Sequence, residues 1–363
     1  MPTPIYALEP FYGGSHRIFL EGLRREVIPD LHILSMSPHH WKWRMHGSAL
    51  YYADRFERDA LRPGLVLASD FVHLSALRGL VPSPGEWDWL LFFHENQLTY
   101  PFREKRDRDL TYAHMNIQSA LAADRVYFNS RFHREDFLGA IPDFYARFVD
   151  YKPAGVPDRI RGKSEILPLG LDLRRLDAQP KTGPDAGSGI ILWNQRWEHD
   201  KHPELFFRTL FQLADEQVPF RVMVCGEHFP DSPEIFAAAR SRLGERMLHW
   251  GYVEREQDYA ALLHRADIVV STARHEFFGI AVLEAMYCRC YPLLPKRLVY
   301  PEYIPPERRN QNLYTSDRDL YRKLKFALTR IGQTRQIQFR DRAARFDWSR
   351  MAPRWERALH RGE

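Results

Sequence analysis

The sequence contains no apolar run long enough to cross a membrane, and it carries no recognisable secretion signal. A membrane-spanning helix needs about 20 mostly apolar residues, and no such stretch occurs among the 363 residues. The first ten residues, MPTPIYALEP, lack the basic segment and apolar core of a signal peptide, so we expect them to lead into a first strand. Internal repeats and low-complexity tracts are also missing. These absences favour a globular protein that does not contact a membrane.

Cysteine is scarce, because Cys225, Cys288 and Cys290 are the only three in the chain. A small, odd number does not suit a disulfide framework and fits a reducing compartment, so we expect a cytoplasmic protein. The spacing of Cys288 and Cys290 is too short for the usual zinc ligand pairs, and no second pair of ligands accompanies it. We therefore expect buried thiols, no metal and no other cofactor.

The charge is unevenly distributed along the chain. The net charge is +5, but residues 1–170 hold 21 basic and 21 acidic side chains, whereas residues 318–363 hold 13 basic and 5 acidic ones. A basic segment of this kind can bind a polyanion such as a nucleic acid. It can equally be the solvated face of amphipathic helices, and charge alone does not separate these two interpretations.

Short apolar segments alternate with amphipathic ones, which predicts an α/β protein with parallel sheets. The expected strands of the first half are 5–8, 31–35, 65–68, 89–93, 125–128 and 166–169, and those of the second half are 190–193, 221–225, 247–250, 268–271 and 291–294. Between the two halves, residues 179–189 are rich in Pro, Gly and small side chains, as in a linker. We therefore predict Rossmann-like domains at 1–178 and 188–335, followed by two helices in 336–363 that break near Asp347.

The segment after the first strand of the second half offers two cations. Arg196 and Lys201 lie five residues apart in WNQRWEHDKHP. Open α/β sheets bind ligands at the carboxyl ends of their strands. Arg can contact two phosphate oxygens while Lys supplies a compact charge, so the pair could stabilise a leaving diphosphate. The alternative is a solvated loop.

A second motif, HEFFGIAVLE, places two carboxylates eight residues apart. Glu276 follows a strand and could accept hydrogen bonds from sugar hydroxyls, and Glu284 lies two turns into the next helix, where it could reach a ribose diol. Between them the backbone of Phe278, Gly279 and Ile280 could approach a diphosphate. Both carboxylates could instead be ordinary helix residues, but the apolar residues around them favour a buried helix start.

The first half offers candidate donor-binding and acceptor-binding residues after two of its strands. Gly13 and Gly14 let the backbone pack against a phosphate or an acceptor, and we expect them to bind the donor. His16 follows them at the start of a helix, and we expect it to bind the acceptor. His94 could orient or deprotonate an acceptor hydroxyl. The neighbouring Glu95 and Asn96 add further polar groups at that strand end.

Large aromatic and basic side chains alternate in the segment HHWKWRMHGS. Trp41, Lys42, Trp43 and Arg44 form its centre. Such a composition is typical of surfaces that stack on bases and pair with phosphates. The alternative is a loop that is buried by its own tryptophans.

These motifs together resemble those of a known family. The second half, with Arg196, Lys201, Glu276 and Glu284, resembles the retaining family 4 glycosyltransferases of the GT-B fold, in which two Rossmann-like domains face each other and a C-terminal helix crosses back to the N-terminal domain. The first half is similar to the tRNA-queuosine mannosyltransferases in three motifs: LEPFYGGSH, WKWRMHGSAL and FHENQLTYP. This resemblance covers nearly the whole chain.

The resemblance implies transfer of mannose from GDP-mannose to a cyclopentenediol hydroxyl of queuosine at the wobble position of aspartate tRNA, without a metal. It implies that Arg196 and Lys201 stabilise the diphosphate, that Glu276 holds the sugar and Glu284 the ribose, and that His94, Gly13 and Gly14 shape the sugar and acceptor region. Two alternatives stay open at this point. One is a related enzyme with a lipid, glycan or small-metabolite acceptor, and the other is a catalytically silent tRNA-binding protein on the same scaffold.

Overall fold

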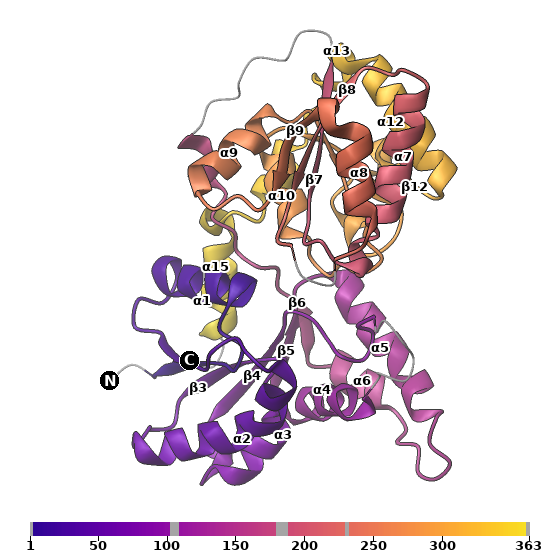
Figure 1. The fold of residues 1–363 in the computed structure, drawn as a ribbon. Coiled ribbons are helices and arrows are strands. Elements are labelled where there is room, and N and C mark those ends of the chain that lie inside the picture. Colours follow the sequence, from indigo (N-terminus) through magenta and orange to yellow (C-terminus); the bar gives the residue numbers. More distant parts are fainter. Residues whose placement is uncertain (1–2, 102–108, 179–187, 229–231, 361–363) are drawn as a thin grey trace. The chain divides into compact units, whose positions relative to one another are not determined.

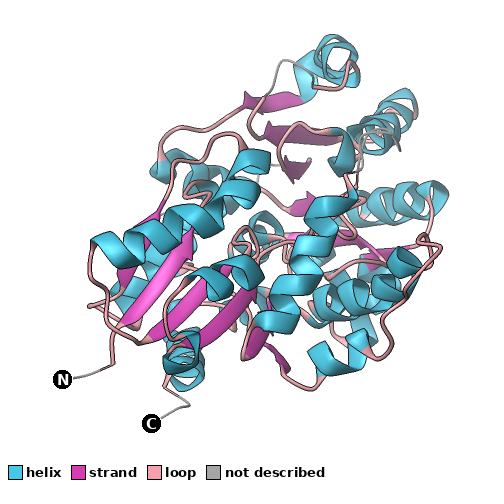
Figure 2. Ribbon diagram, turned by 90° about the horizontal axis from the view of Figure 1, so that it is seen from below, coloured by secondary structure: helices cyan, strands magenta, loops and turns pink. Residues whose placement is uncertain are grey.

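The computed structural model describes residues 3–101, 109–178, 188–228 and 232–360. The chain divides into two compact units, residues 1–171 with 348–363 and residues 172–347 (Figure 1). Each unit is built on its own six-stranded parallel sheet, and helices lie on both sides of the strands (Figure 2). The predicted α/β class with two Rossmann-like domains is confirmed.

The first unit has the strand order β2-β1-β3-β4-β5-β6. Its strands are β1 (Ile5–Glu9), β2 (His32–Ser35), β3 (Leu65–Ser69), β4 (Asp88–Phe93), β5 (Arg125–Phe128) and β6 (Ser164–Ile166). Its helices are α1 (Gly14–Glu26), α2 (Trp41–Arg58), α3 (Leu74–Leu80), α4 (Leu110–Ala122), α5 (Arg131–Tyr145), α6 (Val156–Arg161) and α15 (Trp348–Leu359). The central strands β3 and β4 are apolar except for Ser69 at the end of one and Asp88 at the start of the other, because helices cover both faces of the sheet.

The second unit has the strand order β12-β11-β10-β7-β8-β9. Its strands are β7 (Gly189–Asn194), β8 (Phe220–Cys225), β9 (Met247–Gly251), β10 (Ile268–Val270), β11 (Tyr291–Pro295) and β12 (Leu313–Tyr314). Its helices are α7 (Pro203–Asp215), α8 (Ile235–Leu243), α9 (Glu256–Arg265), α10 (Ile280–Tyr287), α11 (Arg309–Asn312), α12 (Asp317–Thr329), α13 (Ile331–Thr334) and α14 (Arg340–Ala344).

Each strand order reverses once, and that position determines where a ligand can bind. The reversal lies between β1 and β3 in the first unit and between β7 and β10 in the second. The connections leave these neighbouring strands in opposite directions, so a crevice opens at their carboxyl ends. The predicted site residues that follow β1, β7 and β10 therefore lie at the two positions that the topology favours for ligands.

Two strands differ from the predicted ones. The strand expected at residues 166–169 is instead β6, Ser164–Ile166, because Pro168 has no N–H with which to continue the ladder. The short strand β12, Leu313–Tyr314, was not predicted, since two residues give no periodic pattern.

The C-terminal region contains the two expected helices, and they belong to different units. Helix α14 lies in the second unit, where Arg340 pairs with Asp177 at 2.5 Å. Helix α15 belongs to the first unit, as expected for a helix that crosses back, and its Trp355 donates to the carbonyl of Pro168 at 3.0 Å. A Cβ on Gly170 would lie 2.3 Å from the Trp348 ring, so only glycine fits beneath α15 at this position.

The unit boundaries differ from the predicted domain limits 1–178, 188–335 and 336–363. Residues 172–178 belong to the second unit, where Arg175 pairs with Glu256 and Glu284. Most of the predicted linker, at 179–187, lies outside the described residues.

Candidate active site

The second unit brings the two predicted donor motifs together at the crevice between β7 and β10. Arg196 lies two residues after β7, and Glu276 lies in the loop between β10 and α10. The Arg196 side chain is 52% exposed and pairs with Glu198 at 3.2 Å. It therefore presents a cation to solvent at the carboxyl edge of the sheet, where a diphosphate can reach it.

Lys201 has very different surroundings from Arg196. Its side chain is only 10% exposed, and its ammonium lies 3.0 Å from Asp200 and 3.5 Å from Glu276. It also donates to the carbonyl of His275 at 3.1 Å. Burial alone would lower its pKa, but the two carboxylates outweigh this and raise it. Lys201 is therefore a permanent cation that joins the β7 loop to the β10 loop.

Glu276 also orders the start of helix α10. Its Oε1 accepts the backbone N–H of Gly279 at 3.0 Å, and Gly279 has a φ of +74°, which favours glycine. The Gly279 N–H, which we expect to meet the diphosphate, donates its hydrogen bond to Glu276 in this structure. The predicted contact residue Phe278 has a buried ring between Tyr303 and Phe346. The next residue, Ile280, is half-buried and is the first residue of α10.

Glu284 lies inside the second unit rather than on an exposed helix face. It is 8% exposed, and its two carboxylate oxygens accept hydrogen bonds from Arg175 and from the Tyr259 hydroxyl, the latter at 2.9 Å. Burial raises the pKa of Glu284, and Arg175 opposes that rise. Arg175 and Tyr259 were not predicted as site residues, because they come from segments about 109 and 25 positions away from Glu284.

The first unit gathers a buried polar cluster at the carboxyl ends of β1 and β4. Glu9, the last residue of β1, contacts His16 with 2.9 Å between Oε2 and Nδ1. The His16 ring stacks on the His94 ring at a centroid distance of 4.1 Å. The predicted residues His16 and His94 therefore lie together, and Glu9 is a member of the cluster that sequence analysis did not single out.

The two histidines in this cluster have opposite pKa shifts. Burial lowers the pKa of His16, but the Glu9 charge and hydrogen bond, with help from Asp70 and Glu95, raise it to about 9. Burial and the neighbouring His16 cation lower the pKa of His94 well below its usual value. His94 is therefore a neutral imidazole at neutral pH, which is the form that can accept a proton or a hydrogen bond.

Asp70 fixes the loop after β4. It directly follows β3, which lies at the reversal of the strand order, and its Oδ1 accepts the backbone N–H groups of His94 at 2.8 Å and of Glu95 at 3.4 Å. Asn129 adds a hydrogen bond to the carbonyl of His94 at 2.8 Å. The position of Asp70 directly after an apolar strand is visible in the sequence, whereas its burial and its contacts with the β4 loop are not.

The remaining first-unit candidates have structural contacts of their own. Asn96 is fully buried, and its side-chain oxygen accepts the backbone N–H groups of Leu98 and Thr99 at 3.0 and 2.9 Å. It therefore shapes the turn that follows β4. Gly13 caps helix α1, and Gly14, the first helical residue, has a φ of +50° with open space beside it.

The segment that alternates aromatic and basic residues forms the first turns of helix α2, not a loop. Trp43 is 66% exposed and Lys42 is exposed, whereas Trp41 packs against Tyr112 at 5.1 Å. Arg44 donates to the Ser37 hydroxyl at 2.8 Å. Four residues of this segment are predicted to contact the acceptor, and of these Trp43 and Lys42 are presented to solvent.

Among the described residues, one group has the composition and spacing of a metal site. Single ligand atoms of Glu9, His16 and His94 lie within 4.8 Å of one another. The contact of Glu9 with His16 already gives both side chains a partner without an ion. The expected absence of a metal stays a prediction.

Comparison with known proteins identifies the family. Residues 4–171 match the family described as tRNA-queuosine alpha-mannosyltransferase N-terminal, and residues 175–334 match glycosyl transferases group 1. The chain is 40% identical over 332 residues to the tRNA-queuosine alpha-mannosyltransferase of Drosophila melanogaster, which covers 88% of this chain and 85% of the fly protein. The chain belongs to the tRNA-queuosine alpha-mannosyltransferase family. The resemblance inferred from the sequence motifs is confirmed.

Solved structures agree on the fold of this family member. HepE from Anabaena, solved with UDP and glucose, has a TM-score of 0.72 at 14% identity over 99% of each chain. Sucrose-phosphate synthase from Thermosynechococcus elongatus has a TM-score of 0.71 at 15% identity, again over 99% of each chain. The predicted GT-B class is confirmed, and the protein is a hexosyltransferase by family. Within the described part of the chain, no helix has both the length and the apolar character needed to span a bilayer.

Proposed function

We propose that the protein transfers mannose from GDP-mannose to a cyclopentenediol hydroxyl of queuosine at the wobble position of aspartate tRNA. The observation that carries this proposal is the 40% identity to the fly mannosyltransferase over both units of the chain. The clustering of the predicted residues at both strand-order reversals supports it. With a tRNA substrate, we expect the protein to act in the cytoplasm.

The second unit would bind the donor. Arg196 meets the leaving diphosphate, because it is an exposed cation at the crevice. Lys201 holds Glu276 in place and adds positive charge beneath the site. Glu276 accepts hydrogen bonds from the sugar through the oxygen that does not bind Gly279. Glu284 would bind the ribose through the acceptor sites that its two present partners leave open, because a carboxylate has about four such sites.

The reaction would retain the configuration at mannose C1. The bond from C1 to the β-phosphate oxygen breaks, and the acceptor oxygen forms its bond to C1 on the same face. The acceptor proton passes to the departing diphosphate, so no carboxylate nucleophile and no metal ion is needed. Neutral His94 holds a sugar or acceptor hydroxyl by a hydrogen bond.

The first unit would bind the tRNA. The exposed Trp43 ring offers a stacking surface, and Lys42 beside it offers a cation for a phosphate. Both side chains are exposed, which supports a role in binding.

Mass spectrometry of nucleosides tests this function. Queuosine-containing aspartate tRNA is incubated with the protein and GDP-mannose, then digested to nucleosides. We expect queuosine to gain one hexose, and the same tRNA with guanine at the wobble position serves as the control. Hydrolysis of GDP-mannose without a gain on queuosine would overturn the acceptor assignment and favour a lipid, glycan or metabolite. Failure to bind any nucleotide sugar would favour a silent tRNA-binding protein.

A further inference from the structure

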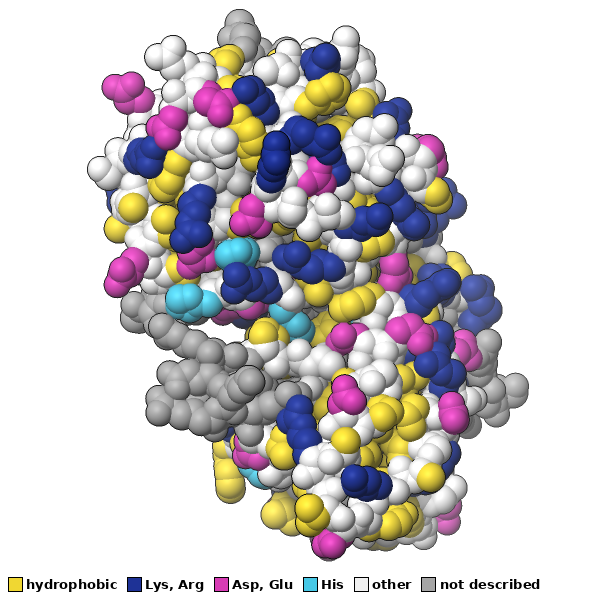
Figure 3. Space-filling view, turned by 90° about the vertical axis from the view of Figure 1, so that its right-hand side faces the viewer, with side chains coloured by type: hydrophobic (Ala, Val, Ile, Leu, Met, Phe, Trp, Pro, Cys, Tyr) yellow, Lys and Arg dark blue, Asp and Glu magenta, His cyan; other side chains and the backbone are white. Residues whose placement is uncertain are grey.

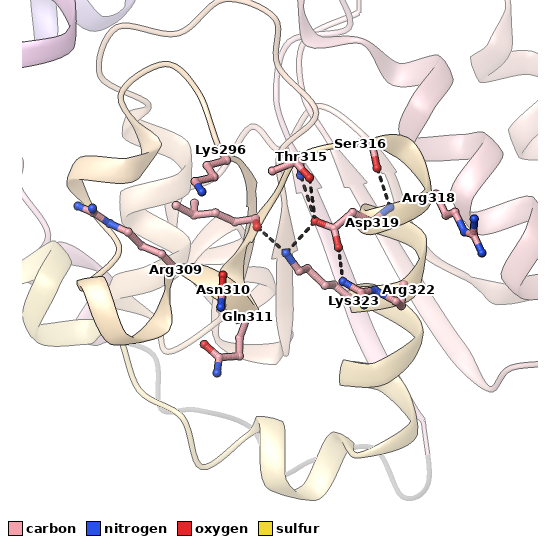
Figure 4. A pocket seen from close by; sticks show the side chains of 11 residues that line it. Lys296, Arg309, Asn310, Gln311, Thr315, Ser316, Arg318, Asp319, Arg322 and Lys323 are labelled. Carbon is pink, nitrogen blue, oxygen red and sulfur yellow. Dashed lines mark hydrogen bonds and ion pairs between the residues drawn. The ribbon is translucent and has the colours of Figure 1, made fainter.

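A basic hollow lies in the second unit, beside the predicted donor loops. It has a volume of about 740 Å³, and its lining comes from the loop after β11, from α11 and from the start of α12 (Figure 4). Strands β10, β11 and β12 are parallel neighbours, so their carboxyl ends share one edge. With about 4.8 Å between adjacent strands, this hollow begins one to two strands away from the loop that carries Glu276.

The lining is strongly cationic. The lining contains five basic residues and one acidic residue, Asp319, and its other members are Asn310, Gln311, Leu313, Thr315 and Ser316. The basic residues are Lys296, Arg309, Arg318, Arg322 and Lys323. Pockets for small organic ligands are mostly apolar, so this composition fits an anion.

Most of this positive charge is not neutralised within the protein. Asp319 forms ion pairs with both Arg322 and Lys323, each at 2.8 Å. Arg309 is anchored to the carbonyls of Ile304 and Pro301, at 3.3 and 2.9 Å, and no carboxylate pairs with it among the described residues. The Lys296 and Arg318 side chains likewise have no partner in the described part of the chain.

Basic side chains are also common elsewhere on the surface of the second unit. Figure 3 shows many Lys and Arg side chains on one face of it, with Asp and Glu side chains among them. The part of the basic C-terminal segment that lies in the second unit, residues 318–347, carries 9 basic and 3 acidic side chains. A group of cations that lack carboxylate partners suits the phosphates of a nucleic acid.

We propose that this hollow binds the phosphate backbone of the tRNA, and that Lys296 and Arg318 contact phosphates directly. The proposal rests on the function proposed above, and it assigns to the donor-binding unit a share in recognising the acceptor RNA. Phosphate contacts give affinity and register without reading sequence, so this hollow would position the tRNA and leave selection of queuosine to the other unit.

The test is the salt dependence of tRNA binding by the full chain, with the double variant Lys296→Ala/Arg318→Ala. Each lost phosphate contact lowers the slope of log affinity against log salt by roughly 0.7–0.9. We therefore expect a slope reduced by roughly 1.5 and an affinity at least about tenfold weaker near 0.1 M salt. The KM for tRNA should rise by the same factor, with kcat and GDP-mannose binding unchanged.

A matched control removes two exposed arginines from the other end of the same strands, where their amino ends lie. Arg240 lies in the last turn of α8, and Arg289 follows α10 just before β11 with a φ of +70°. Arg240→Ala/Arg289→Gly removes the same charge, and glycine suits that backbone angle. We expect wild-type tRNA affinity and slope for this variant, and a melting temperature like the wild type for both double variants.

The outcomes separate this inference from the proposed function. Wild-type affinity and slope in the Lys296→Ala/Arg318→Ala variant would overturn it, even if the wild-type protein mannosylates queuosine. A second result would also overturn the inference: inorganic phosphate inhibits mannose transfer by the wild type but no longer by the double variant, while both bind tRNA equally. The hollow would then bind a free anion. If the wild-type protein adds no mannose, direct tRNA binding still decides the role of the hollow.

Discussion

Replacing Arg196 should abolish transfer and leave the fold intact, whereas replacing Lys201 should damage both. The two cations come from one motif, but their surroundings differ: the Arg196 side chain is 52% exposed and that of Lys201 is 10% exposed. The variants Arg196→Ala and Lys201→Met therefore separate a catalytic cation from one that also supports the structure.

The expected magnitudes follow from burial. An exposed ion pair such as Arg196 with Glu198 contributes about 0–1 kcal/mol, so Arg196→Ala should melt within a few degrees of the wild type. Loss of a preorganised charge at a developing anion typically lowers kcat by about 10²–10³. Removing one partner of a buried pair costs about 3–5 kcal/mol, so Lys201→Met should lower the melting temperature by about 6–20 °C for a unit of this size.

Two measurements on the same samples check this reasoning. Thermal unfolding without nucleotide reports stability, and the rate of mannose transfer at saturating substrate reports kcat. Arg208→Ala, which removes an exposed arginine from α7, is the control for a mere change in charge. Near-normal turnover in Arg196→Ala would refute the donor-site assignment, and a wild-type melting temperature in Lys201→Met would refute the buried-pair account.

Three further predictions concern the other clusters. The pKa of His16 is raised from 6.5 to about 9, so its pair with Glu9 stabilises the protein fully below about pH 6.5. This stabilisation, on the order of 3 kcal/mol, is lost as the pH rises through 9. Urea unfolding of Glu9→Gln should show a flatter pH dependence than the wild type, and an unchanged profile would contradict this account. Arg175→Ala should lower the free energy of unfolding by about 3–5 kcal/mol, because it leaves the buried Glu284 carboxylate without its cation. The double variant Arg175→Ala/Glu284→Gln should recover part of this loss. If calorimetry shows that the losses of the two single variants add up in the double variant, the pair does not stabilise the protein. Trp43→Ala should weaken tRNA binding by about 1–3 kcal/mol with unfolding unchanged within about 0.5 kcal/mol, and equal tRNA affinity in a filter-binding assay would remove Trp43 from the interface.

The strands could be predicted because burial on both faces gives each one a short apolar run. Ten of the eleven expected strands match the structure to within about a residue, and the shifted one, β6, ends where Pro168 interrupts the ladder. Strand β12 could not be predicted, because Leu313 and Tyr314 are assigned by their pairing with β11 alone. The aromatic and basic segment at Trp41 is helical because its downstream residues pack on the core, which local composition does not reveal.

The candidate site was predictable where chemistry and position along the chain coincide. Arg196 and Glu276 follow apolar strands, so their place at a carboxyl edge follows from the α/β alternation. Glu9 and Asp70 were missed because their roles depend on contacts with His16 and the β4 loop, which lie on other segments of the chain.

The sequence alone determined the fold class, the family and the two donor motifs, because apolar periodicity and motif spacing are local properties of the chain. Only the tertiary structure decided which of the motif residues are accessible to a ligand. It buried Lys201 between two carboxylates, gave Glu284 two partners and kept Arg196 exposed. Burial and partners depend on segments far apart in sequence, and these set the pKa and the accessibility on which chemistry depends.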